Sequence, residues 1–313
     1  MAIKTNYTFA SADGVSAIHA VRWLPVDGNV RAVLQIVHGM VEYIERYTPF
    51  AEFLTTKGYA VFGHDHIGHG DSVSSPEEWG IMHADDPSDV MVADMFTNYK
   101  HVKEEYPDVP YYILGHSMGS YMLRKYLSVK GAQLQGVNGA IVMGTGTEPA
   151  AAMGLVVAKT LAKLKGRDYR APIMVKLTFG APYKMYDLTG QDAANSWLTK
   201  NEAFVKKYYN DPKCTYLFSL NGYIGLLSAV KYDGSAANVA KIPKNIPILF
   251  ASGDKDPVGN HGKGVQQAYD LFKAAGIEDV TLRLFEGDRH EILNETDSDK
   301  VFAELYDWME SKK

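Results

Sequence analysis

The sequence has one cysteine, no long apolar run and little excess of either charge, and each shortage excludes something. With Cys214 as the one cysteine among 313 residues, the chain forms no internal disulfide and suits a reducing compartment. No run reaches the roughly 18 apolar residues of a membrane-spanning helix, and the start MAIKTNYTFASADG lacks the apolar core of a signal peptide. The net charge of −5 gives no reason to expect nucleic acid as a partner. We therefore expect a soluble cytoplasmic protein.

Apolar runs bounded by turn residues predict an α/β fold. Two alternating segments flank an Asp13-Gly14 turn, which is typical of a β-hairpin. Buried strands are then expected at 31–39, 59–65, 111–116, 137–145, 246–253 and 280–287. Helices are expected at 47–57, 88–105, 118–130, 264–276 and 299–312. Strands that alternate with helices favour a mostly parallel central sheet with helices on both faces.

This alternation is interrupted once. Residues 148–244 have the pattern of helical and irregular chain, and the alternation of strand and helix resumes at 246. We therefore expect an α/β core built from residues 1–147 and 245–313, with residues 148–244 inserted as a helical cap.

The segment ILGHSMGS places Ser117 between Gly115 and Gly119, where an expected strand meets an expected helix. A turn this tight forces its central residue into strained backbone geometry, and glycines two positions away relieve the crowding. The hydroxyl of Ser117 would then lie at the carboxyl edge of the sheet, where open α/β sheets bind ligands. We predict that Ser117 is a nucleophile.

A serine hydroxyl needs a base, and the base needs an orienting acid. His290 follows the last expected strand, so it should reach the same edge of the sheet as Ser117. The acid should come from the loop GDKDPVGN after the preceding strand. Asp256 is favoured, because Pro257 holds the loop extended; Asp254, an ordinary turn position, remains the alternative. The order Ser, Asp, His is that of α/β-hydrolases.

Two backbone amides are expected to bind the oxyanion. One is the amide of Met118, directly after the nucleophile, and the other is that of Met40, after the sharp His38-Gly39 corner.

A second cluster, HDHIGH at 64–69, nearly matches a zinc-binding pattern of clustered histidines. Gly68 stands where that pattern needs an aspartate ligand of the second metal, so we expect no metal. The proposed triad needs no organic cofactor either.

The inserted cap contains two apolar segments. Segment 150–167 places Met153, Val157, Leu161 and Leu164 on one stripe with lysines elsewhere, which is typical of a helix on a lipid surface or, the favoured alternative, of one packed on the core. Segment 215–232 is nearly uncharged and could form a wall that buries an acyl chain. Its expected substrate-binding residues are Phe218, Leu220, Tyr223, Ile224 and Leu227.

Six segments together resemble one known family. They are HGMVEYIERY, DHIGHGDS, GHSMGS, WLTKNEAFVKKYYNDP, GDKDPVGNHGKGV and EGDRHEIL, in the family's order from His38 to Leu293. They resemble the lysophospholipase and monoacylglycerol lipase branch of the α/β-hydrolases. The resemblance implies a serine esterase with a helical cap, with Ser117, Asp256 and His290 as the triad. Tyr43 stands where the family often has histidine.

The sequence thus predicts a hydrolase of carboxylic esters of lipid alcohols, monoacylglycerols or lysophospholipids, acting through an acyl-serine. The expected partner is a small lipid ester, with transient contact between the cap and a membrane surface and no obligate protein partner. An aminopeptidase or amidase with the same triad is the enzyme alternative, since fold alone does not settle chemistry. A binding protein that kept the fold without turnover is the other.

Overall fold

A computed structural model describes residues 2–313, and they contain one eight-stranded sheet. Its strands are β1 (Ile3–Ala10), β2 (Ala17–Leu24), β3 (Ala32–Val37), β4 (Tyr59–His64), β5 (Tyr111–His116), β6 (Val137–Met143), β7 (Ile248–Gly253) and β8 (Val280–Phe285). They lie in the order β1-β2-β4-β3-β5-β6-β7-β8. The β1–β2 and β2–β4 pairs are antiparallel and the others parallel. The expected mostly parallel sheet with a leading hairpin is confirmed.

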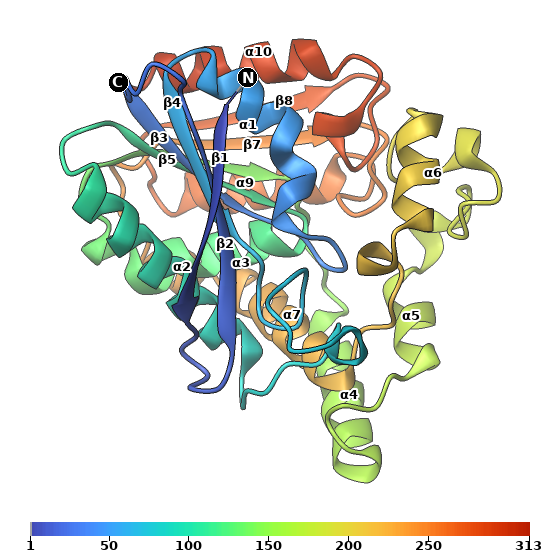
Figure 1. Ribbon diagram of the computed structural model, residues 1–313. Helices are drawn as coiled ribbons and strands as arrows, with labels where there is room; N and C mark the ends of the chain where they lie inside the picture. The colour runs from blue at the N-terminus through green and yellow to red at the C-terminus, as the bar shows by residue number, and fades with distance from the viewer. Residues whose placement is uncertain (1) are drawn as a thin grey trace.

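Helices of the core cover both faces of this sheet (Figure 1). They are α1 (Thr48–Thr55), α2 (Pro87–Glu105), α3 (Met118–Lys130), α9 (Lys263–Ala274) and α10 (Ser298–Glu310). Side chains of α1 and α10 share one apolar cluster with the strands, and those of α2, α3 and α9 share the other. Because both faces are covered, the central strands are continuous apolar runs, and all six residues of β3 are buried.

The one polar side chain of β3 shows how tightly this interior is arranged. Gln35 is fully buried, donates from Nε2 to the carbonyl of Met95 at 3.1 Å and accepts from the hydroxyl of Tyr111 at 2.8 Å. Both ends of its amide are therefore paired, as a buried polar group requires.

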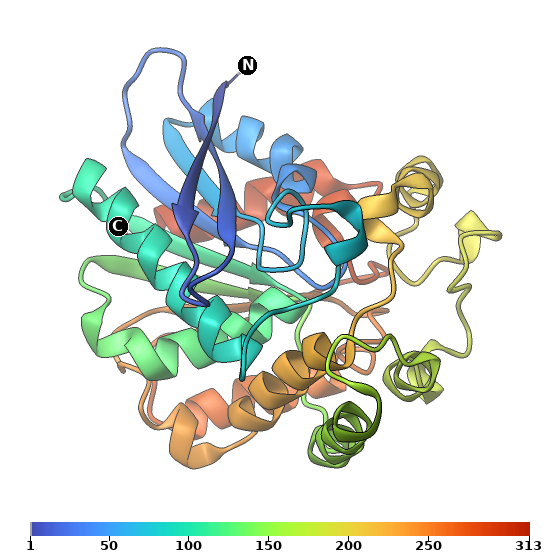
Figure 2. The same cartoon turned by 60° about the horizontal axis from the view of Figure 1, so that its bottom comes forward.

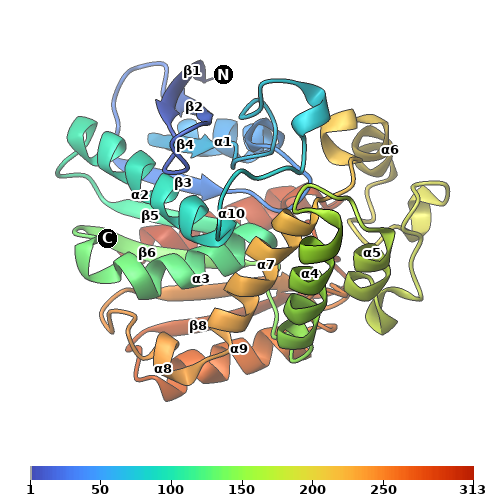
Figure 3. The same cartoon turned by 90° about the horizontal axis from the view of Figure 1, so that it is seen from below.

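The inserted segment lies between β6 and β7 and is helical. Its helices are α4 (Ala151–Lys165), α5 (Pro172–Thr178), α6 (Glu202–Asn210), α7 (Leu220–Asp233) and α8 (Ala236–Val239). Figure 3 shows α7 between α3 and α4, with α5 and α6 beyond them to one side of the sheet. The cap therefore rests on the core through α7, while its limits at 148 and 244 stay a prediction. Within residues 2–313, no helix combines the length and the apolar character needed to cross a membrane.

The predicted apolar stripe of α4 is wrong in its position. The buried residues are Ala151, Leu155 and Ala158, whereas Met153 is 69% exposed and Leu164 is 74% exposed. Val157 and Leu161 are half-buried at the margin. Small residues let α4 approach α7 closely, which turns the larger apolar side chains outward. Figure 2 shows α4 and α5 nearly end-on, side by side.

Candidate active site

Ser117 occupies the sharp turn between β5 and α3. Its backbone has φ 53° and ψ −121°, a strained conformation for a residue with a side chain. A Cβ on Gly119 would lie 2.2 Å from the carbonyl oxygen of Val37, and one on Gly115 would lie 2.4 Å from that of Gly119. Neither position has room for a side chain, so both glycines of the segment are required by packing.

His290 and Asp256 meet in the buried interior next to this turn. The Nδ1 atom of His290 is 3.0 Å from Oδ2 of Asp256. The other carboxylate oxygen accepts from the backbone N–H of Val258 at 2.8 Å, and Ser252 donates to Oδ2 at 3.2 Å. The Asp256 carboxylate is thus fixed from several sides while it holds one imidazole nitrogen.

Asp254, the alternative acid, lies elsewhere. Its carboxylate accepts from the backbone N–H of Gly287 at 2.8 Å and pairs with Lys255 at 3.4 Å. The carboxylate therefore holds the turn after β8 and makes no hydrogen bond to the imidazole of His290.

Ser117 and His290 line the same cavity, of about 480 Å³, together with Met40. In this conformation of residues 2–313, no hydrogen bond joins the serine hydroxyl to the imidazole. Catalytic hydrogen bonds of this kind are often long before substrate binds. The two side chains are therefore shown only to face the same cavity.

A second cavity, of about 270 Å³, also reaches Ser117. Four residues line both cavities: Met40, Ser117, Phe179 and Trp197. The second cavity is mainly apolar and extends between α3, α4 and α7. The serine therefore stands where two separate compartments meet.

The five expected substrate-binding residues divide between these compartments and the core. Phe218 and Tyr223 line the first cavity, and Leu227 lines the second. Leu220 and Ile224 line neither, because the face of α7 that carries them packs into the main apolar cluster. For these two residues the structure differs from the expectation.

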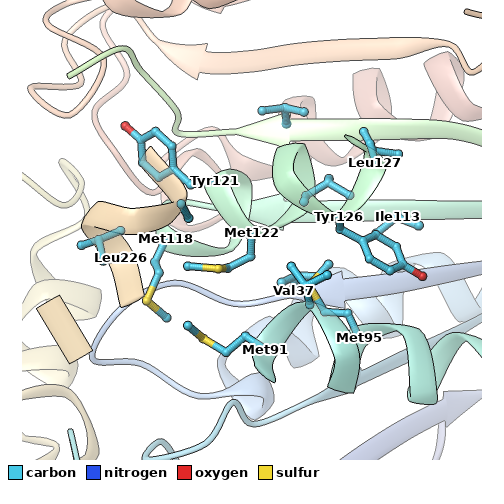
Figure 4. Close-up of a cluster of buried hydrophobic side chains, with 14 of the residues drawn as sticks. Val37, Met91, Met95, Ile113, Met118, Tyr121, Met122, Tyr126, Leu127 and Leu226 are labelled. Carbon is cyan, nitrogen blue, oxygen red and sulfur yellow. The ribbon is translucent and has the colours of Figure 1, made fainter. Parts of the chain in front are cut away.

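Met118 and Met40 flank Ser117 as the sequence places them. Met118 is the first residue of α3, and its side chain is buried beside Met91 and Leu226 (Figure 4). Met40 is half-buried and lines both cavities. The role of their backbone amides in binding an oxyanion stays a prediction.

The histidines of segment 64–69 do not converge as ligands. Among residues 2–313, the candidate ligand atoms that lie within 4.8 Å of one another belong to His19, Asp65 and Asp71. Asp65 already accepts from Nδ1 of His19 at 2.8 Å and from the backbone N–H groups of Ile44 and Asp71 at 2.7 and 2.9 Å. Its carboxylate therefore organises the loop after β4.

Most of the chain matches one known protein family. The family model described as "Serine aminopeptidase, S33" matches residues 28–297, more than half of the chain. The chain belongs to this family. The expected resemblance is therefore confirmed.

Named relatives agree over nearly the whole length. The chain is 28% identical over 295 residues to the monoglyceride lipase of Homo sapiens, covering 93% of this chain and 86% of that protein. It is 27% identical over 310 residues to the monoacylglycerol lipase of Mycolicibacterium smegmatis, covering 98% of each. Among solved structures, the carboxyl esterase of Bacillus coagulans in complex with glycerol superposes with a TM-score of 0.89 at 27% identity, covering 99% of this chain and 98% of that one.

In this member of the family, a buried polar network that sequence reasoning missed lies beside His290. Glu42 accepts from the backbone N–H of Gly39 and from the hydroxyl of Tyr47, and hydrogen-bonds Nδ1 of His116 at 3.1 Å. Its other oxygen pairs with Arg46 at 2.6 Å. The spacing of Glu42 and Arg46 in HGMVEYIERY, four residues apart, is the signal that could have indicated an ion pair.

Arg46 also reaches the loop of His290. Its guanidinium pairs with Glu291 at 2.7 Å, and it lies over the ring of Tyr208 in α6 at 4.9 Å. Arg46 therefore links the loop after β3, the loop after β8 and the cap. Tyr43, where the family often has histidine, donates to Asp211 at 2.8 Å and thus serves local packing against the cap.

The charges in this network settle the protonation of its members. Burial alone would raise the pKa of Glu42, but the Arg46 guanidinium and the hydrogen bond to His116 hold it well below its ordinary value. Burial alone would lower the pKa of His116, but its hydrogen bond to Glu42 and the Glu42 charge outweigh burial and raise it. Protonation of His116 therefore stabilises the folded protein.

The variant His116→Asn tests this coupling. Because the folded-state pKa of His116 is raised, its contribution is fully present below about pH 6.5, the unfolded value, and is lost as pH rises through the folded value. The wild type should therefore exceed the variant in free energy of unfolding by a larger margin at pH 5.5 than at pH 9. Urea unfolding across this range measures the difference.

The matched control is His83→Asn, at an exposed histidine, whose effect on stability should be small at every pH. A stability difference for His116→Asn that does not change with pH would contradict the coupling.

Proposed function

We propose that this chain hydrolyses carboxylic esters of lipid alcohols, monoacylglycerols or lysophospholipids, through an acyl-serine at Ser117. The family and its relatives make the chain a carboxylic ester hydrolase; the acyl intermediate and the substrate are what we add. One observation carries the proposal: the strained Ser117 lies at the meeting point of two cavities, beside a buried His290–Asp256 pair.

The chemistry follows from these groups. His290 takes the proton of the Ser117 hydroxyl as the oxygen attacks the ester carbonyl, and Asp256 stabilises the imidazolium through Nδ1. The amides of Met40 and Met118 hold the oxyanion. His290 then gives its proton to the leaving alcohol, and afterwards activates water, which releases the fatty acid and restores Ser117.

The two cavities suggest how a lipid ester would lie. His290 must reach the leaving oxygen, and it lines only the larger cavity, so the alcohol belongs there. The apolar cavity between α4 and α7 then receives the acyl chain, where each buried methylene is worth about 0.8 kcal/mol. This assignment favours lipid esters.

The aminopeptidase alternative needs a free carboxylate to hold a substrate ammonium group. The carboxylates that line the larger cavity are Glu42 and Glu291, and both are paired with Arg46. Since both carboxylates already have hydrogen-bonded partners, neither is free to bind an ammonium group in the larger cavity, which favours an ester there over a peptide with a free amino terminus.

Hydrolysis of p-nitrophenyl esters from acetate to palmitate tests the proposal. The wild type should prefer medium or long chains, because the apolar cavity binds them. Ser117→Ala should lower kcat roughly a million-fold and Asp256→Asn about ten-thousand-fold, since the imidazole loses its orienting acid. Asp254→Asn is the matched control and should retain most of the activity.

Several results would count against the proposal. Activity in Ser117→Ala would rule out the acyl-serine. If Asp254→Asn were inactive and Asp256→Asn active, the orienting acid would be Asp254 and not Asp256. Cleavage of acetate alone would assign the apolar cavity to something other than an acyl chain.

We also propose that the cap contacts a lipid surface from which the substrate enters. Large apolar side chains of α4 and α5 are exposed: Met153, Val156, Leu164, Ile173 and Leu177. Lysines accompany them on the same helices, at 159, 163, 165 and 176. Exposed apolar residues with basic neighbours are typical of helices that lie on anionic lipid.

Sedimentation with vesicles of mixed phosphatidylcholine and phosphatidylglycerol tests this contact. Val156→Glu should weaken vesicle binding several-fold, because it puts a charge into the apolar surface. Val15→Glu, an equally exposed valine in the hairpin turn, is the control and should bind as the wild type does. If Val156→Glu bound vesicles as strongly as Val15→Glu and the wild type, the proposed lipid contact of the cap would be wrong.

A further inference from the structure

Trp197 lies on the proposed catalytic histidine. Trp197 lies before α6, which begins at Glu202, so its side chain is not part of that helix. The indole ring instead stacks on the imidazole of His290, with ring centroids 5.0 Å apart and planes inclined by 27°. Trp197 also lines both cavities. A side chain of the cap thus covers one face of the base.

The chain around Trp197 is fastened to the loop of His290. The backbone N–H of Glu291 donates to the carbonyl of Leu198 at 2.8 Å. Thr199 donates to the carbonyl of Asn294 at 3.0 Å. The Arg289 guanidinium donates to the carbonyl of Ser196, and Lys200 pairs with Asp288 at 2.7 Å. Residues 196–200 of the cap are therefore held against the loop that carries His290 by several hydrogen bonds and an ion pair.

Two aromatic residues of the cap also contact the indole. Phe179 and Tyr183 meet Trp197 edge-on, with centroids 5.6 and 5.5 Å away. These contacts fix the indole plane from the cap side, so its face is held against His290.

Other groups also pack around the imidazole. Asp256 holds Nδ1, and the ring of His116 lies with its centroid 4.7 Å away, backed by Glu42. A Cβ on Gly144 would lie 3.1 Å from Cε1 of His290. Trp197 is the part of this enclosure that the cap supplies.

We propose that Trp197 is a positioning residue, by which the cap holds the imidazole of His290 in its reactive orientation and stabilises its protonated form. The proposal rests on the proposed function, in which His290 becomes cationic as it takes the proton of Ser117. Indole is the best aromatic partner of a cation. The titratable and charged groups around this imidazole are Asp256 and His116, with Glu42 behind His116 and the Glu291–Arg46 pair following in the chain.

Steady-state kinetics of Trp197→Leu, Trp197→Phe and Leu227→Ala test the proposal. Trp197→Leu should lower kcat about tenfold, and the acidic limb of kcat/KM should move to lower pH by about half a unit, since a cation–π contact is lost. Trp197→Phe should recover part of both effects. Leu227→Ala, at a residue that lines the second cavity and not the one that His290 lines, should alter KM and leave the acidic limb in place.

Tryptophan fluorescence supplies a readout that does not require turnover. A protonated imidazole in contact with indole quenches its emission. The wild type should therefore show a fluorescence titration at the pH of the acidic limb, which Trp197→Phe and His290→Gln both remove. Ser117→Ala should show the same fluorescence titration as the wild type. Because this variant lacks the proposed nucleophile, its titration tests the contact between Trp197 and His290 independently of the proposed reaction.

The two sets of results distinguish the possible failures. A rise in KM alone, with kcat and the acidic limb unchanged, would reduce Trp197 to a lining residue and overturn the proposal. A fluorescence titration that survives in His290→Gln would overturn it as well, even if Trp197→Leu failed to fold. Activity in Ser117→Ala would instead defeat the proposed function, while the titration would still report on the contact between Trp197 and His290.

Discussion

The strained backbone of Ser117 is the constraint on which the arrangement of the site depends. A positive φ at a residue with a side chain costs of order 1–3 kcal/mol and persists only where the surroundings impose it. Here β5 lies near the centre of the sheet, and α3 begins directly after Ser117. Gly119 packs so closely against Val37, at the end of β3, that a side chain on it would clash with the Val37 carbonyl. The fold stabilises the turn, and the turn presents the hydroxyl to both cavities.

The site is assembled from loops that are far apart in sequence, and buried charges hold them together. Glu42 and Arg46 connect the loop after β3 with Glu291 beside the proposed base. Removing one member of such a network would leave an uncompensated buried charge, which costs about 3–5 kcal/mol. The network therefore stabilises the relative placement of the amide of Met40 and the imidazole of His290.

Much of this could be predicted from the sequence, because the relevant signals are local. Alternating apolar runs gave the strands, and glycines around Ser117 marked the turn. Chain order assigned His290 and Asp256 to neighbouring strand ends, and Asp256 rather than Asp254 hydrogen-bonds the imidazole.

The cap was harder to predict, because its contacts are set by tertiary packing. The stripe through Met153 and Leu164 fits a helical period, yet small residues of α4 face α7. Leu220 and Ile224 belong to a helix that is buried on several sides, so periodicity could not separate its cavity face from its core face. The contact of Trp197 with His290 joins segments some ninety residues apart and leaves no periodic signal.

The central claim is that Ser117 is the nucleophile, and covalent labelling tests it most directly. A fluorophosphonate reacts with an activated serine hydroxyl and leaves a stable adduct, which tandem mass spectrometry assigns to one residue. We predict one adduct per chain, on Ser117, which forms far more slowly in His290→Gln. An enzyme that is inactivated by an adduct on another residue, or that still hydrolyses esters with Ser117 fully labelled, would contradict the account.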